Sequence, residues 1–331
     1  MPPVRYFGFK KETSFGEEAT GSTFDIDVAS AALDVPDDPN IEVPTLNRFQ
    51  MKHIPGYYVP KGAVEYPIDI QTITHFLYFA LGGYTCTEGT SGQKNTHELY
   101  ATQSHVPHSF TARIGKDNFE HVFLGTVIDK LNLTVEDDVA TMKMDMLAKM
   151  DKRATIRTDL TQPPGDLFPI AFYNAGTSIN TMDISSDVKS WELEFSNGIK
   201  EDRGRGQGSR FPYYFEQGEG ECTLTLKLRD DDSEILERFW GAIGSTEPGT
   251  TPHTPFSVTT TFNSGSYGTM TVKFPRCYFK KIDTSIKGAD PREPGIEIGC
   301  EAEEVTLLDG TTKKVTPVYF KVENDLTSLI S

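Results

Sequence analysis

Three histidines that lie close together in the sequence are the first residues with the chemistry to bind a metal ion. His97, His105 and His108 each carry imidazole nitrogens, which are common metal ligands. Their spacing matches no ligand motif, and the segment 85–108 around them is rich in Gly, Ser and Thr, as loops are. We therefore predict that these histidines are exposed to solvent in a loop and hold no metal.

A run of acidic residues is the second candidate for a cation site. Asp230, Asp231 and Asp232 follow one another directly, but they fit neither an EF-hand calcium loop nor a pair of facing carboxylates. Ser233 comes next, and a helical pattern of apolar residues begins at Leu236. Because side-chain oxygens before a helix cap its first free amides, we predict a helix-capping role for these aspartates.

A glycine-rich segment with arginines is the third candidate, because such loops can bind phosphate groups. Residues 204–208 read Gly-Arg-Gly-Gln-Gly. No buried strand leads directly into this segment and no helix follows it, although a phosphate-binding loop requires both. We predict a mobile loop between two strands. Its arginines, Arg203, Arg205 and Arg210, would contact acidic surfaces of neighbouring subunits.

The remaining chemistry gives no indication of an enzyme, a cofactor or a metal site. The cysteines lie far apart without a CxxC pair, which favours buried free thiols over zinc binding, redox motifs or disulfides at Cys86, Cys222, Cys277 and Cys300. A hydrolase would need two carboxylates that converge on one cleft, and no spacing in the sequence shows such a pair. We therefore predict a protein that is not an enzyme and binds no cofactor.

The composition describes an acidic chain that is long enough for two domains. Its 331 residues include 48 acidic and 32 basic ones, which gives a formal net charge of −16. This charge repels nucleic acid phosphates, so a generic DNA-binding protein is disfavoured. No apolar run is long enough to span a membrane, and the N-terminus has no signal-peptide pattern. We expect the chain to be made and kept in a cytoplasm without contacting a membrane.

Alternation of apolar and polar residues is the dominant pattern and predicts a mainly β protein. Segments 131–136 and 142–146 alternate with a period of two on either side of Asp137-Asp138, which predicts a hairpin with one apolar face. Segment 191–195 repeats the pattern. The polar sides of these strands carry our candidates for a functional surface: Lys130, Asn132, Thr134, Glu136, Glu192 and Glu194.

Two short segments have the apolar spacing of an amphipathic helix. The first lies in residues 73–80 and ends at Gly82, and the second lies in 236–243 and ends at Gly244. We expect each helix to cover one open β-sheet. The apolar positions of the two helices correspond at an offset of 163 residues: Ile73, Phe76, Leu77 and Ala80 match Leu236, Phe239, Trp240 and Ile243.

An internal repeat extends beyond the helices. Two further residues align in the same order in both halves, Glu65 with Glu221 and Phe110 with Phe256. Two three-residue segments also align, Lys130-Leu131-Asn132 with Lys281-Ile282-Asp283 and Met144-Asp145-Met146 with Ile296-Glu297-Ile298. Their offsets vary, as expected where loops have gained or lost residues. We predict a duplication, with a first β domain in residues 1–165 and a second in 166–331. The boundary falls in the proline-containing segment 161–165.

The order of these features resembles the tail tube proteins of long-tailed, siphovirus-type bacterial and archaeal viruses. The resemblance rests on segment 109–135, which reads as strand, loop and amphipathic strand, on segment 62–69 before the first helix, and on strand 189–198. It implies two tandem β-sandwich or barrel-like domains, each with one short flanking α-helix. In this family, strands of neighbouring subunits join into a ring around a pore, and the rings stack into a tube.

The resemblance also implies a role in the virion tail. The tube holds the tape measure protein during assembly and later conducts duplex DNA to the host, past an acidic lumen that does not bind it specifically. Further implied partners are the tail terminator and tail tip proteins, and assembly takes place in the host cytoplasm. The candidate strand residues and loop arginines would then face the lumen or a neighbouring subunit.

A duplicated tube domain predicts a ring of three chains with sixfold pseudo-symmetry, with a ring of six chains as the alternative. Two other functions remain open from the sequence. A two-domain β-sandwich that binds carbohydrate or another ligand would use aromatic residues such as Tyr57 and Tyr213. A distal tail protein or a secretion-system tube protein would share the fold. A ligand-binding module would stay monomeric in dilute solution, whereas a tube subunit forms rings or filaments as its concentration rises.

Overall fold

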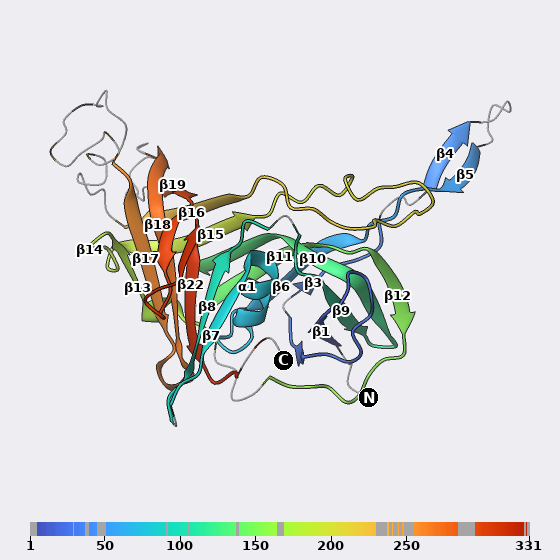
Figure 1. Ribbon diagram of the computed structural model, residues 1–331, viewed down its shortest axis with the longest axis horizontal. Coiled ribbons are helices and arrows are strands. Elements are labelled where there is room, and N and C mark those ends of the chain that lie inside the picture. The colour runs from blue at the N-terminus through green and yellow to red at the C-terminus, as the bar shows by residue number, and fades with distance from the viewer. Residues whose placement is uncertain are drawn as a thin grey trace, which may run out of the picture.

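The protein is mainly β, as predicted, and in the described part of the chain its strands surround a central helix (Figure 1). This computed structural model describes residues 5–331 except 29, 37–39, 45–50, 91, 105, 137–138, 164–168, 230–236, 238–239, 241–243, 245–246, 248–253, 284–294, 328 and 330–331. None of the helices within those limits has the length and apolar character that crossing a membrane requires.

Sheet A has the strand order β2-β1-β9-β10-β12, with every pair antiparallel. Its strands are β1 (Arg5–Lys11), β2 (Phe24–Ile26), β9 (Phe110–Lys116), β10 (Phe119–Glu136) and β12 (Met150–Ala154). Strand β10 has 18 residues, and its pairing with β9 ends at Thr126. The rest of β10 belongs to a second sheet, so this strand connects the two sheets.

Sheet B has the antiparallel order β3-β6-β11-β10-β15-β16-β19-β18-β17-β13-β14. A branch of three strands, β22-β8-β7, continues from the first part of β18. The bounds are β3 (Ser30–Ala31), β6 (Lys61–Pro67), β7 (Gly82–Thr87), β8 (Asn95–Ala101), β11 (Val139–Leu147), β13 (Ala175–Ile179), β14 (Met182–Asp183), β15 (Val188–Ser196), β16 (Glu221–Leu228), β17 (Phe256–Asn263), β18 (Thr269–Ile282), β19 (Gly295–Glu301) and β22 (Tyr319–Asn324).

Two separate hairpins complete the β structure. Strands β4 (Asn40–Pro44) and β5 (Met51–Pro55) form an arm at the opposite end of the molecule from β17, β18 and β19 (Figure 1). Strands β20 (Glu303–Thr306) and β21 (Lys313–Thr316) form the second hairpin, with Gly310 at a φ of 71° in the connection. Two short 3-10 helices also occur, η1 (Phe172–Asn174) and η2 (Gly265–Tyr267).

The predicted hairpin of residues 131–146 is confirmed as β10 paired with β11. Leu131 lies opposite Met144 and Leu133 opposite Met142, and these four side chains are fully buried. Because successive residues of a strand point to opposite faces, the polar residues between them are directed outward. Burial of each such apolar side chain stabilises the fold by about 1.5–3 kcal/mol, which fixes the register of the pair.

Helix α1 (Ile73–Leu81) begins and ends where the sequence predicts it. The carboxylate of Asp69 accepts hydrogen bonds from the backbone N–H groups of Gln71 and Thr72, and Gly82 terminates the helix with a left-handed φ of 86°. All nine residues of α1 are buried. A helix that is apolar all round belongs in a core, so α1 is enclosed by strands rather than covering the outside of one sheet.

The same order of strand pairings occurs twice in the chain. In the first half, β6, β11, β10, β9, β1 and β2 are successive neighbours, and in the second half β16, β19, β18, β17, β13 and β14 are. Strand β12 pairs with the first part of β10, as β22 does with β18. The registers also correspond, because Asp145 lies opposite Lys130 and Glu297 lies opposite Lys281.

The strand pairings contradict one aligned pair of the sequence repeat, Glu65 with Glu221. Glu65 lies opposite Lys143, and Lys227 lies opposite Gly295, two residues before Glu297. Since Lys143 likewise comes two residues before Asp145, the structural counterpart of Glu65 is Lys227 and not Glu221. The alignment of two glutamates followed residue identity, whereas the pairing follows the alternation of the strands.

His75 on α1 makes the stability of the fold depend on pH. Its ring packs against Phe9 and Phe24, with centroid distances of 5.5 and 5.3 Å, and the residue is 7% exposed. Burial disfavours the imidazolium form and lowers the pKa of His75 from 6.5 to about 3. Burial of neutral His75 therefore contributes fully to stability above pH 6.5, and this contribution is lost as the pH falls toward 3.

Between pH 7 and pH 5, we expect the free energy of unfolding to fall by about 2 kcal/mol more in the wild type than in a His75→Gln variant. Glutamine keeps a polar side chain of similar reach but does not titrate. Urea denaturation of the unassembled protein at the two pH values measures this difference. The same pH dependence in both proteins would contradict the assignment.

Candidate functional site

The candidate residues of β10 and β15 lie together on one face of sheet B: Lys130, Asn132, Thr134, Glu136, Glu192 and Glu194. Strands β10 and β15 pair so that Asn132 lies opposite Glu194 and Thr134 lies opposite Glu192. The Nζ atom of Lys130 is 3.6 Å from Oε1 of Glu194. In the sequence these residues belong to two separate strands, and the structure makes the strands neighbours.

This face continues over β6, β11, β16, β18 and β19, and we call it the polar sheet face. The strand registers and side-chain hydrogen bonds place acidic and basic groups on it in similar numbers among the described residues. The acidic residues include Glu65, Glu136, Asp145, Glu192, Glu194, Glu221, Glu297 and Glu301. The basic residues include Lys61, Lys130, Lys143, Lys227, Arg276, Lys280 and Lys281.

Ion pairs neutralise several lysines of the polar sheet face. The ammonium group of Lys227 lies 2.9 Å from Glu136, and that of Lys280 lies 2.7 Å from Glu221. The hydrogen bond from Lys280 lowers the pKa of Glu221, so this carboxylate is charged at neutral pH. The charges of the face are therefore nearly balanced, and it presents few free cations to a passing polyanion.

The arginine-containing loop joins β15 to β16, as predicted, but it is held by contacts within the chain. The guanidinium carbon of Arg205 is 5.1 Å from the ring centroid of Tyr57, and that of Arg210 is 5.0 Å from the ring of Tyr58. Arg203 donates a hydrogen bond of 3.1 Å to Glu216. These cation–π and ionic contacts order the loop against residues 57–58. The three arginines are therefore separate from the charged residues of the polar sheet face.

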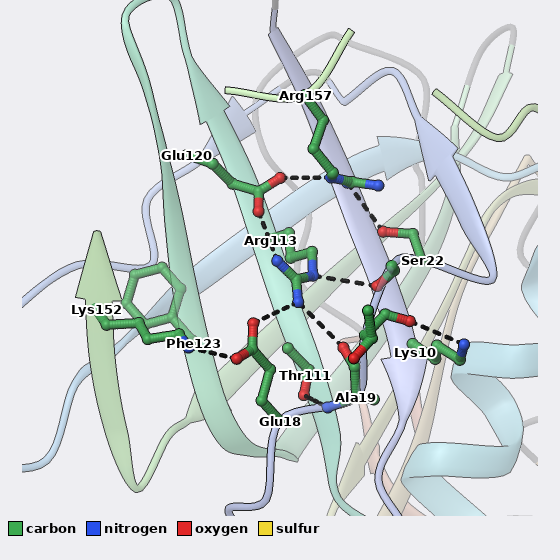
Figure 2. Close-up of polar contacts among 12 residues, drawn as sticks. Lys10, Glu18, Ala19, Ser22, Thr111, Arg113, Glu120, Phe123, Lys152 and Arg157 are labelled. Atoms are coloured by element: carbon green, nitrogen blue, oxygen red, sulfur yellow. Dashed lines mark hydrogen bonds and ion pairs between the residues drawn. The ribbon is translucent and has the colours of Figure 1, made fainter. Parts of the chain in front are cut away.

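A buried charge cluster that the sequence analysis did not single out fastens two segments to sheet A (Figure 2). Arg113 Nη1 lies 2.6 Å from Oε1 of Glu120, and its Nη2 lies 2.6 Å from Oε1 of Glu18. Arg157 Nε lies 2.7 Å from Oε2 of Glu120, and its Nη2 lies 2.7 Å from Oδ1 of Asp25. Glu120 thus lies between two guanidinium groups. The cluster as a whole joins β9 and β10 to the segments that contain Glu18 and Arg157.

The ionisation of this cluster is set by its hydrogen bonds. Burial acts to raise the pKa of Glu120, but hydrogen bonds from Arg157, Tyr6 and Arg113 outweigh it and lower the pKa. Burial, and then the hydrogen bond to Glu120, raises the pKa of Tyr6 to about 12. Arg113 and Glu120 are close in sequence, which is one signal for the pair, but nothing in the sequence connects them to Glu18 or Asp25.

The prediction of solvent-exposed loop histidines is wrong for His97. This residue is fully buried in β8, where its Nδ1 is 3.0 Å from the hydroxyl of Tyr84 and its Nε2 is 3.1 Å from the carbonyl of Leu326. The segment forms β7 and β8 because β22 covers it, a pairing that local composition does not reveal. His108 is half-buried and stacks on Tyr78 at 4.6 Å.

Several sequence predictions fall outside the described residues. They are His105, the capping role of Asp230, Asp231 and Asp232, and the second helix at Leu236, Phe239 and Ile243. Pro164 and Gly165 of the predicted domain boundary lie outside as well. The four cysteines are free thiols, of which Cys222 and Cys277 are buried and Cys86 and Cys300 are partly exposed.

The arrangement most similar to a catalytic base with an orienting carboxylate is His121 with Asp151. His121 Nε2 lies 2.6 Å from Oδ2 of Asp151, and the hydroxyl of Tyr58 donates to Oδ1 at 2.6 Å. The other ring nitrogen faces the Lys116 ammonium at 3.4 Å rather than a nucleophilic hydroxyl or thiol. Among the described residues, no three His, Cys, Asp or Glu side chains are arranged to hold a metal ion.

A profile of the family described as phage tail tube protein matches residues 4–302. The match includes the polar sheet face, the arginine loop and the buried charge cluster, and it extends over both halves of the chain. It agrees with the resemblance that segments 62–69, 109–135 and 189–198 carry. No curated protein matches the chain at a significant level.

Proposed function

The chain belongs to the phage tail tube family, and on that premise we propose that it forms a tube through which duplex DNA reaches the host. As a member of this family it is a structural component of a virion tail and assembles with itself into a tube. We propose further that the tail is of the siphovirus type, that the tube holds the tape measure protein, and that tail terminator and tail tip proteins close its ends. Assembly takes place in the host cytoplasm, without enzymatic activity or a cofactor.

The polar sheet face is the surface that we assign to the pore wall. It is continuous over neighbouring strands, it is polar throughout, and its lysines are largely paired with carboxylates. A wall of this kind gives a DNA phosphate no unpaired cationic track to bind, and the formal charge of −16 adds long-range repulsion. DNA passes such a wall without specific binding. For Arg203, Arg205 and Arg210, whose loop is ordered by contacts within the chain, we propose an additional contact with a neighbouring subunit instead of a place on the pore wall.

The recurrence of strand pairings supports the duplication into residues 1–165 and 166–331. Two similar domains in one chain allow a closed ring of three chains with six similar units, because one contact repeats through a fixed rotation. The contact within the chain is then a guide to the contact between chains. A ring of six chains is the alternative, in which only one half of each chain would line the pore.

Strand β15 shows how the two halves meet within the chain. It pairs with β16 on one side and with the second part of β10 on the other. In the repeated pattern, β3 has the place of β15, because β3 pairs with β6 as β15 pairs with β16. The second part of β18 has the place of β10, and in the described residues the pairing of β18 with β17 ends at Cys277.

We therefore propose that β3 of one chain pairs with this edge of β18 in the next chain. Unpaired strand edges must be paired, covered or charged, and a ring pairs them. Within the molecule, β18 and the β4–β5 arm that follows β3 in the chain lie at opposite ends, as a head-to-tail ring requires (Figure 1).

Tubes assembled from a mixture of ¹⁴N- and ¹⁵N-labelled chains test this ring. We expect cryo-electron microscopy to show three chains per ring, and a lysine-specific cross-linker to join Lys281 of one chain to Lys61 of another in mixed-isotope peptide pairs. The structural counterparts of these residues, Lys130 and Thr223, are separated by only one strand. As a control, cross-links between Lys130 and Lys143 should remain within one isotope. Six chains per ring, with one half outside the pore wall, would refute the proposed assembly.

Charge reversal on the polar sheet face tests the pore wall. A Glu192→Lys, Glu194→Lys double variant should fold with a change of about 0.5 kcal/mol or less per exposed site. Virions that contain it should deliver DNA poorly, because four units of positive charge are added along the proposed path. The matched control is Glu303→Lys with Glu304→Lys on the separate β20–β21 hairpin. Equal infectivity of both assembled mutants would contradict a lumenal position of Glu192 and Glu194.

A further inference from the structure

Three of the four cysteines form one row across neighbouring strands. Cys277 on β18 lies directly opposite Cys300 on β19, and their sulfur atoms are 3.9 Å apart. The register of β16 with β19 pairs Thr223 with Gly299, so the preceding residue, Cys222, lies opposite Cys300. Cys300 is thus the central thiol, with one thiol neighbour on each side.

The row opens onto a cleft of about 360 Å³. Cys222 and Cys300 line this cleft together with the polar side chains of Asn197, Gln217 and Glu221. Cys300 is partly exposed, whereas Cys277 is fully buried behind it. The volume of the cleft is in the range of small-molecule sites, so a small oxidant can reach Cys300 without unfolding of the sheet.

We propose that this row is an oxidation site, at which a low-molecular-weight disulfide such as oxidised glutathione converts Cys277 and Cys300 into a disulfide. The thiolate of Cys300 attacks one sulfur of the oxidant, and the first glutathione leaves and takes up a proton. The thiolate of Cys277 then attacks Sγ of Cys300 in the mixed disulfide, and the second glutathione leaves in the same way. The protein loses two hydrogen atoms, and the oxidant is reduced to two thiols.

The strand geometry suits this bond. Residues directly opposite each other in an antiparallel pair have Cα atoms about 4.5–5.5 Å apart, which lies within the range of about 4.4–6.8 Å found in disulfides. Only the side chains need to turn, since the sulfur atoms must approach from 3.9 Å to about 2.05 Å. Cys222 offers a second partner to Cys300, so the bond can exchange between neighbours of the same central thiol.

The environment of the row sets the speed of the reaction. The pKa of Cys300 is raised, mainly by its neighbour Cys222. The pKa of Cys277 is also raised, mainly by its contact with Cys300 and then by burial. The thiolate is the attacking species, so oxidation is slow at neutral pH and accelerates as the pH rises. Cys86 lies apart on β7, where its thiol donates to the carbonyl of Thr327 at 3.5 Å, and it provides an internal control.

Incubation of the folded, purified chain with oxidised glutathione tests the proposal. After quenching and unfolding, titration with a thiol reagent should show the loss of two of the four thiols, and non-reducing peptide mapping should join Cys277 to Cys300. A Cys86→Ser variant should also lose two thiols, and a Cys300→Ser variant should lose none from the row. Because the mapping of the wild-type protein decides by itself, misfolding of a variant does not obscure the result. Four free thiols, or oxidation confined to Cys86, would overturn the proposal.

Discussion

Replacing Glu120 with alanine is expected to lower the free energy of unfolding by about 3–5 kcal/mol. Glu120 is 1% exposed and lies between the guanidinium groups of Arg113 and Arg157. Its removal leaves Arg113 with Glu18 and Arg157 with Asp25, so each guanidinium group loses one of its two carboxylate partners. Removing one partner of a buried ion pair costs far more than the pair contributes in total, because the remaining charge keeps its desolvation penalty.

Urea denaturation of the unassembled protein measures this loss, and Glu194→Ala is the matched control. Glu194 makes an ion pair with Lys130 at 3.6 Å, but both side chains are exposed. The same substitution there should cost less than about 1 kcal/mol. If Glu120→Ala cost as little as Glu194→Ala, Glu18 and Asp25 would suffice to neutralise the two arginines, and Glu120 would have no special role in the cluster.

Replacing Phe76 with alanine is expected to destabilise the fold by about 3–5 kcal/mol. Phe76 is fully buried on α1, and its ring lies 4.6 Å from that of Phe9 and 5.3 Å from that of Tyr66. The side chain therefore contacts sheets A and B at once. Its truncation leaves a cavity between two sheets that the long strand β10 holds in place, so the site cannot collapse to recover the lost contacts.

Thermal and urea denaturation of three variants separate this effect from a general sensitivity to substitution. Phe76→Leu keeps most of the volume and should lose clearly less stability than Phe76→Ala. Tyr173→Ala removes an aromatic ring that is 79% exposed and should change the free energy of unfolding by about 0.5 kcal/mol or less. Similar stability of all three variants would show that α1 is not the centre of the core.

Local patterns predicted much of the fold because they depend on neighbouring residues alone. The alternation in 131–146 fixed the hairpin of β10 and β11, and the apolar spacing that ends at Gly82 fixed α1. The polar residues of β10 and β15 could also be identified as outward-facing from the same alternation. Their position next to each other could not, because it depends on the pairing of two strands that are distant in the sequence.

The misjudged positions share this dependence on distant segments. His97 lies in a segment with the composition of a loop, and it is buried only because β22 pairs with β8. The buried charge cluster joins Glu18, Arg113 and Arg157 from three parts of the chain, and no periodicity brings such residues together. The helix is enclosed for the same reason, since strands from both halves surround it.

The pairing of β8 with β22 also determines when the molecule can finish folding. The hydrogen bond from Tyr319 to Glu98 spans 221 residues of chain. On the ribosome, β8 is synthesised long before the strand that covers it. Contacts between residues so far apart in the sequence form slowly even afterwards. The branch β22-β8-β7, and the first part of β18 on which it rests, therefore close only after translation has passed residue 324. Until then a nascent chain lacks β22, so His97 and the rest of β8 are without the strand that covers them in the finished fold.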